Sequence, residues 1–231
     1  MNAAAKAGGA PSIRDARRQM YRQQILIAAE YEFARSGFTE AKVTAIAAAA
    51  DVSLATVYKN FEGKDEIWDV LQAQRMNELV DAVRAATAAT TSPLERLLVG
   101  ARAQLEFFAA NPNFLALHVK EGLSWATAMG GGEAGRGGQR MAWRAGIEML
   151  TQGVKDAVRA GELSHANPSI VAGLMISALQ VWLTDWVVGG RKRPASVVAD
   201  EFVDYLRTAV LRPGSETEPA EPAPVARRRR A

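Results

Sequence analysis

The chain has 231 residues, no cysteine and a formal net charge of +3. This length is enough for one large domain or two small ones, and the lack of cysteine excludes disulfides, thiol catalysis and cysteine-based zinc sites. Because the net charge is small, any binding of nucleic acid must depend on a local basic face.

Residues 1–14 are small and polar, and they are predicted to form a disordered arm. They lack the apolar block and cleavage site of a signal peptide. No purely apolar run is long enough for a membrane span, so a cytoplasmic protein is expected. Arg14, Arg17, Arg18 and Arg22 form either a solvated first helical turn or a basic arm that lies along phosphates.

A first helix is predicted over residues 16–36. Its apolar side chains recur at three- and four-residue steps on one face, namely Tyr21, Ile25, Ala28, Ala29 and Phe33. Gly37 is expected to end this helix, since glycine adopts positive φ without strain, and Phe38 is expected to anchor the core.

Two short helices are predicted next, over residues 43–50 and 54–61. The segment Asp51-Val52-Ser53 separates them: aspartate tolerates turn conformations, and the Ser53 hydroxyl can cap the second helix. A helix, a tight turn and a lightly built second helix are typical of the helix-turn-helix, whose second helix enters the major groove of DNA.

These residues resemble the DNA-binding domain of TetR-type regulators over roughly residues 18–67. The resemblance is carried by Gly37-Phe38, Ile46-Ala47, Ala50-Asp51-Val52-Ser53, Tyr58, Phe61, Lys64 and Ile67. The family usually has serine or threonine in place of Lys42, as a helix cap, and glycine in place of Asp51. The resemblance implies a transcriptional regulator, most often a repressor, with a C-terminal domain for ligand sensing and dimerisation.

The predicted DNA-contacting residues surround the second short helix. Tyr58 either packs at the helix end or donates its hydroxyl to a phosphate, and Thr56 and Lys59 touch either base edges or only the backbone. A cation at a helix start is disfavoured by the helix dipole, so a phosphate partner is predicted for Lys64. The full set is Lys42, Val43, Thr44, Ser53, Leu54, Ala55, Thr56, Tyr58, Lys59, Asn60 and Lys64.

The rest of the chain predicts helices only, which makes the fold class all-α with about nine helices. A long helix starts near residue 63, and further helices start near residues 93 and 112, or span 139–160, 168–188 and 194–210. Residues 129–138 form a Gly-rich loop. The predicted domains are a DNA-binding domain over 15–66, a ligand-binding and dimerisation domain over 67–212 and a disordered tail over 213–231, whose Arg227–Arg230 run is either solvated or grips DNA.

Aromatic residues are concentrated in the predicted C-terminal domain, where they either fill the core or line a pocket for an apolar or aromatic ligand that releases the protein from its operator. His118 and Glu121 are possible polar anchors. They lie three residues apart, but with no second histidine nearby neither a metal nor a cofactor is expected. The predicted pocket residues are Phe108, Phe114, Leu117, His118, Glu121, Trp125, Trp143, Ile147 and Leu150.

The helix predicted over residues 168–188 is apolar nearly all round, so it must be covered on all sides. Either it is the central helix of a monomer, or it forms a four-helix bundle with the last helix and their copies in a homodimer. The predicted interface residues are Leu174, Ser177, Ala178, Val181, Trp182, Phe202 and Leu206.

No catalytic constellation is found, so an enzyme is not expected. The alternative to a regulator is an all-α enzyme or small-molecule carrier whose N-terminal helices only resemble a DNA reader. A gel shift with the DNA upstream of the protein's own coding sequence separates the two.

Overall fold

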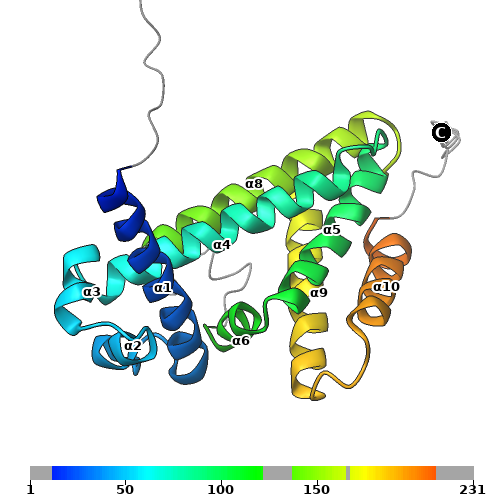
Figure 1. Cartoon of the computed structure of the whole chain (residues 1–231). Coiled ribbons are helices and arrows are strands. Elements are labelled where there is room, and N and C mark those ends of the chain that lie inside the picture. Colours follow the sequence, from blue (N-terminus) through cyan, green and yellow to red (C-terminus); the bar gives the residue numbers. More distant parts are fainter. Residues whose placement is uncertain (1–11, 122–136, 165–166, 212–231) are drawn as a thin grey trace, which may run out of the picture.

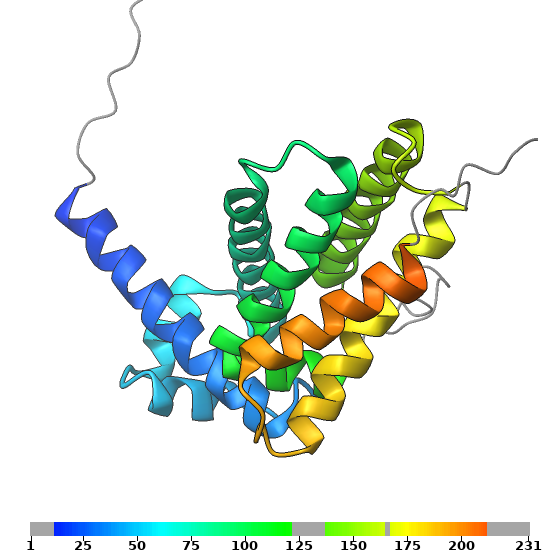
Figure 2. The same cartoon turned by 90° about the vertical axis from the view of Figure 1, so that its right-hand side faces the viewer.

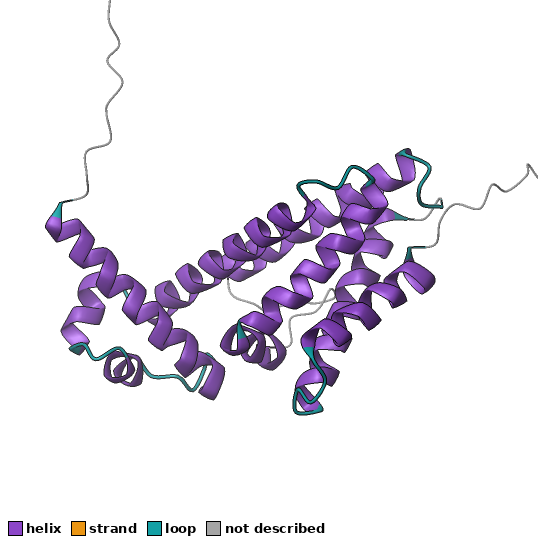
Figure 3. Cartoon of the chain, turned by 45° about the vertical axis from the view of Figure 1, so that its right-hand side comes forward, coloured by secondary structure: helices purple, strands orange, loops and turns teal. Residues whose placement is uncertain are grey.

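The structure, a computed structural model, describes residues 12–121, 137–164 and 167–211. Over these ranges it contains helices and no strand, which confirms the predicted all-α class (Figure 3). The helices are α1 (Ile13–Ser36), α2 (Val43–Ala49), α3 (Leu54–Asn60), α4 (Lys64–Thr87), α5 (Pro93–Ala110), α6 (Pro112–Glu121), α8 (Gly137–Arg159), α9 (Pro168–Val188) and α10 (Ala195–Tyr205), followed by the π-helical turn Leu206–Val210.

Helices α1, α2 and α3 lie together at one end of the molecule (Figure 1). The long helix α4 begins beside them and continues along α5 and α8, while α6 packs against α1. Helices α9 and α10 lie at the opposite end from α3 (Figure 1), with α10 against α5 and α9 against α8 (Figure 2). The helix α4 is therefore shared by the end of the molecule that holds α1, α2 and α3 and by the rest of the chain.

Helix α1 begins three residues earlier than predicted. The Ser12 hydroxyl accepts a hydrogen bond from the backbone N–H of Asp15, at 3.2 Å, and so caps the first turn. The predicted disordered arm over residues 1–14 is thus wrong for Ile13 and Arg14, which are helical. Residues 1–11 of that arm, most of the Gly-rich loop and the tail over 213–231 lie outside the described residues.

The end of α1 is joined to α4 by a cluster of three aromatic rings. Gly37 ends the helix with φ of 80°, and the chain turns so that Phe38 is buried, as predicted. The Phe33 and Phe38 rings each meet the Trp68 ring edge-on, with centroids 5.1 and 5.0 Å apart. Trp68 lies on α4, so this cluster fixes the start of α4 against α1 and the turn that follows it.

Helix α9 starts as predicted, because Asn167 caps it and Pro168 occupies its first turn. By length and composition it could cross a membrane, but half of its apolar window is buried inside the chain, as in the core helix of a protein without a membrane span. Its buried face includes Val171, Met175, Leu179 and Leu183.

Candidate nucleic-acid interface and ligand pocket

The turn between α2 and α3 is built by three consecutive residues. Asp51 adopts a left-handed conformation with φ of 51°, as its side chain permits, and the N–H of Val52 donates to the carbonyl of Ala47 at 3.0 Å. The Ser53 hydroxyl then accepts from the N–H of Thr56, also at 3.0 Å, and caps α3. These contacts hold α3 in one position relative to α2.

The outward face of α3 carries most of the predicted DNA-contacting side chains. Leu54, Ala55, Tyr58 and Lys59 are exposed there, and Tyr58 has 53% of its surface open. Thr56 is half-buried, and its hydroxyl lies 2.8 Å from the Ser53 hydroxyl. An exposed face of this kind has the shape and size to enter a major groove.

The start of α2 contributes a second group of predicted contacts. Lys42 and Thr44 are exposed and Val43 is half-buried. Lys42 precedes the helix in an extended conformation and makes no capping hydrogen bond, which agrees with its lack of an acceptor. Its ammonium group is therefore available to a phosphate.

Asn60 does not fit a direct DNA contact, and its prediction as one is corrected. Only 6% of its surface is exposed, and its side-chain amide donates to the carbonyl of Thr56 at 2.8 Å. The Arg22 guanidinium donates to the Asn60 carbonyl, and its carbon lies 4.1 Å from the centre of the Phe61 ring. Arg22 also pairs with Glu66 at 3.5 Å, so it clamps α1 to the end of α3 and does not extend a basic arm.

Lys64 is engaged within the protein, which corrects its prediction as a phosphate contact. Its ammonium group donates to the carbonyls of Phe38, Thr39 and Ala41 at 2.9, 3.0 and 3.0 Å. These three bonds use all the N–H donors of a lysine. The ammonium also lies 4.6 Å from the centre of the Phe38 ring. Lys64 therefore fixes the loop between α1 and α2, and this explains a cation at the start of α4.

A cavity of about 90 Å³ lies among α4, α5, α6, α8 and α9. Six of the predicted pocket residues line it, namely Phe108, Phe114, Leu117, His118, Ile147 and Leu150. Trp125 lies outside the described residues. Glu121 and Trp143 are in α6 and α8, but their side chains are also outside the description.

The aromatic wall of this cavity is closely packed. The Phe108 and Phe114 rings are stacked with centroids 5.5 Å apart, and the His118 imidazole lies 4.6 Å from the Phe108 ring. Burial lowers the pKa of His118 to about 4, so its ring is neutral near pH 7. The histidine thus offers a polar but uncharged group to the cavity.

Eleven residues of the cavity wall were not predicted from the sequence, and most of them come from α4 and α9. The spacing of the apolar residues predicted a core-facing side of α4 and a dimer helix at α9. No residue type distinguishes a core position from a pocket position. The missed residues are Gln72, Met76, Leu79, Val80 and Val83 from α4, Gln104 from α5, Gly146 and Met149 from α8, and Ile176, Leu179 and Gln180 from α9.

A second cavity, of about 240 Å³, adjoins the first along α4, α5 and α8. It continues toward the end of α4, where Thr87, Arg84, Arg96 and Asp156 line it. The segment of α4 from Gln72 to Thr87 is about 22 Å long at the helical rise of about 1.5 Å per residue. Both cavities are lined by Val80, Val83, Gln104, Gly146, Met149 and Leu150.

The predicted dimer residues divide into two groups. Leu174 and Val181 are exposed on α9, and Ser177 and Trp182 are half-buried, with the Trp182 ring 4.8 Å from the Tyr205 ring. The other three are corrected: Ala178, Phe202 and Leu206 are buried within the same chain, because α10 packs back onto α5 and α9. The exposed apolar stripe of α9 consists of Ile170, Leu174, Val181 and Val188.

The fold and the exposed α3 define an all-α protein of the helix-turn-helix, DNA-binding class. Residues 25–70 match the family described as bacterial regulatory proteins, tetR family. Over this helix-turn-helix segment the chain is similar to the TetR family of transcriptional regulators, which is not a family of enzymes. This similarity favours a regulator over the alternative interpretation as an enzyme.

Similar proteins extend the likeness over most of the chain. An HTH-type transcriptional repressor of Streptomyces coelicolor is 26% identical over 187 residues, which are 81% of this chain and 89% of that protein. The regulator FadR of Bacillus subtilis, solved in complex with stearoyl-CoA, has a TM-score of 0.69 at 17% identity and covers 80% of this chain and 97% of its own. A regulator of Saccharomonospora viridis, solved in complex with choline, has a TM-score of 0.68 at 15% identity, over 84% and 99% of the two chains.

Proposed function

We propose that this regulator is a cytoplasmic homodimeric repressor that leaves its operator when an elongated, largely apolar effector binds along α4. The observation that carries the proposal is that α4 contacts both functional parts of the molecule. Its beginning holds the DNA-reading end, which consists of α1, α2 and α3, through Lys64 and Trp68, and its later turns line both cavities. A ligand that moves α4 therefore changes the position of α3.

The proposed DNA interface consists of the exposed side chains of α3 and the start of α2. Lys42, Tyr58 and Lys59 are suited to phosphates, while Thr44, Leu54, Ala55 and Thr56 face the groove. The domain boundaries proposed from the sequence place residues 15–66 in this part and residues 67–212 in the effector-binding part.

The effector is proposed to have an acyl-like chain. The cavity among the five helices is narrow and mostly apolar, and it continues into a second one along α4, so its shape suits a linear molecule. A cationic effector such as choline finds no acidic side chain among the described lining of the first cavity, and burying an unpaired cation is costly. Stearoyl-CoA, which is bound by the Bacillus subtilis regulator, is the more suitable probe.

Dimerisation is proposed through the exposed apolar stripe of α9, together with the edge of α10 that carries Val197 and Tyr205. A stripe of four large apolar side chains on one helix is costly to leave in water. A second copy of the same surface covers it by two-fold symmetry and places two α3 helices for neighbouring half-sites about 34–36 Å apart.

The experiment measures binding to labelled DNA from upstream of the protein's own coding sequence by fluorescence anisotropy. A salt-dependent complex is expected, and stearoyl-CoA should dissociate it whereas coenzyme A without the chain should not. A complex that persists at saturating stearoyl-CoA would remove acyl chains from the proposal, and the lack of any complex would remove this DNA as the operator.

A further inference from the structure

The first cavity has an unusual distribution of polar groups. Four of its five helices each contribute one uncharged polar side chain, and the remaining lining residues are apolar or glycine. These four are Gln72 from α4, Gln104 from α5, His118 from α6 and Gln180 from α9. No charged side chain lines this cavity within the described part of the chain.

Gln72 is the polar residue whose environment points to a ligand. Only 5% of its surface is exposed, and its side-chain nitrogen Nε2 is buried without a hydrogen-bond partner among the described residues. Buried donors in proteins are almost always bonded, because an unbonded one loses its hydration without compensation. A donor that lines a cavity is satisfied by what occupies that cavity.

The charge of the cavity limits what this occupant can be. A carboxylate would accept a hydrogen bond from Gln72, but it would be buried beside neutral amides and a neutral imidazole, with no cation to offset its desolvation. An ammonium group cannot accept the bond at all. An uncharged oxygen, such as the carbonyl of an ester, ketone, aldehyde or thioester, can accept the bond from Gln72 and brings no charge into the cavity.

We propose that the first cavity binds an apolar chain bearing an uncharged carbonyl, whose oxygen accepts a hydrogen bond from Gln72 Nε2. This inference rests on the proposed effector function and specifies the polar group of the effector. The effector is a neutral carbonyl compound, not a free fatty acid or a quaternary amine. Gln72 also lies three residues before Arg75, which pairs with Glu30 of α1. A ligand held by Gln72 thus contacts α4 one turn from its link to the DNA-reading end.

The test compares four probes of equal chain length by isothermal titration calorimetry on the full chain at pH 7.5. The probes are methyl decanoate, decanal, ionised decanoate and decyltrimethylammonium. The two neutral carbonyl compounds are expected to bind on the order of tenfold more tightly than decanoate, since only decanoate must bury a charge that no cation in the cavity offsets.

The variant Gln72→Leu removes the donor and keeps the volume of the side chain. It is expected to reduce the affinity for methyl decanoate on the order of tenfold. Gln24→Leu, which replaces an exposed amide on α1 outside both cavities, serves as the matched control. Gln72→Met is a second variant, should the leucine variant fail to fold. Circular dichroism of each variant checks the fold.

The outcomes separate this inference from the proposed function. Tighter binding of decanoate, an unchanged affinity of the Gln72 variants, or no saturable binding of any probe would overturn the carbonyl site, and DNA release by stearoyl-CoA would still stand. Conversely, a Gln72-dependent preference for the ester with no effect on the DNA complex would keep the carbonyl site and overturn the proposed release.

Discussion

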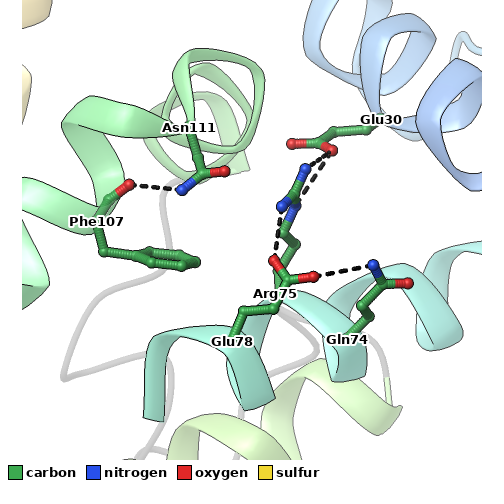
Figure 4. A network of polar contacts seen from close by, with 6 residues as sticks. All are labelled: Glu30, Gln74, Arg75, Glu78, Phe107 and Asn111. Atoms are coloured by element: carbon green, nitrogen blue, oxygen red, sulfur yellow. Dashed lines mark hydrogen bonds and ion pairs between the residues drawn. The ribbon is translucent and has the colours of Figure 1, made fainter. Parts of the chain in front are cut away.

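Arg75 on α4 forms an ion pair with Glu30 on α1, with its Nε and Nη2 atoms 3.2 and 2.5 Å from the same carboxylate oxygen (Figure 4). Its third nitrogen, Nη1, binds Glu78 at 2.6 Å, and Glu78 also accepts from Gln74. The Glu30 carboxylate is only 6% exposed. The pair therefore joins α4, which lines both cavities, to α1 through a contact whose carboxylate is shielded from water.

Replacing Arg75 with methionine is expected to weaken both stability and coupling. The change leaves Glu30 as an unpaired buried carboxylate, which should cost roughly 2–3 kcal/mol of unfolding free energy, less than a fully buried pair because Arg75 is partly exposed. It should also shrink the mutual effect of stearoyl-CoA and DNA, typically 5–150-fold in such systems. Urea unfolding and titration with and without DNA measure the two effects.

The matched control for this prediction lies on the same helix. Arg84 pairs with Asp81 at 2.8 Å, and both side chains are more than two-thirds exposed. Arg84→Met should change stability by about 1 kcal/mol at most, since surface ion pairs contribute little. Equal losses from the two variants would show that the Arg75 pair is an ordinary surface contact.

Lys64→Met is expected to lower DNA affinity without changing its dependence on salt. The variant loses three hydrogen bonds to the loop between α1 and α2, so the loop that leads into Lys42 becomes less ordered. A lysine that contacted a phosphate would instead reduce the slope of log affinity against log salt by about 0.9. Anisotropy titrations at several salt concentrations decide between the two roles.

Lys59→Ala, unlike Lys64→Met, is expected to change either the salt dependence or the sequence preference of DNA binding. Lys59 is exposed on α3 and free to meet a phosphate or a guanine edge. Its removal should flatten the salt slope by about 0.9 if it meets a phosphate. If the slope is kept but the preference among operator variants changes, Lys59 reads a base. No change in either quantity would remove it from the interface.

The sequence predicted the helices well because their signals are local. Ser53 and Asn167 cap helices through contacts two or three residues away, and Gly37 ends α1 through its own backbone. The role of Lys64 could not be predicted in this way, because its carbonyl partners are at least 23 residues distant in the chain.

Contacts between residues that are distant in the chain also explain the errors in the candidate sites. Gln72 and Phe202 lie on apolar faces whose spacing is equal for a core, a pocket and a dimer surface, and only the packing of α9 and α10 separates these cases. The exposure of the α3 residues was easier to predict, since a seven-residue helix packed on one side has one buried face, marked by Val57.

His118 is expected to make stability depend on pH in the acidic range. Its pKa in the folded chain is about 4 because it is buried, below its ordinary value of 6.5, so the unfolded chain binds more protons between these values. Stability is therefore complete above pH 6.5 and falls as the pH drops toward 4, by up to roughly 3 kcal/mol. Urea unfolding of the chain and of His118→Leu measures this, since the variant should lose that part of the slope. Parallel pH profiles of the two proteins would contradict the assignment.

Val181→Glu is expected to separate the proposed dimer into monomers. Val181 is 61% exposed in the middle of the apolar stripe of α9, so its replacement should not disturb the fold of one chain. Two-fold symmetry would bring the new carboxylates close together in an apolar interface, where unpaired charges are strongly unfavourable. Light scattering should report half the mass, and operator affinity should fall on the order of a hundredfold, because the two half-sites are no longer bound together.

Ile27→Glu, at a position of α1 with 60% exposure, is the matched control and should keep the mass of the unaltered protein. A Val181→Glu chain that keeps that mass would place the dimer interface elsewhere, whereas equal loss in the control would point to α1.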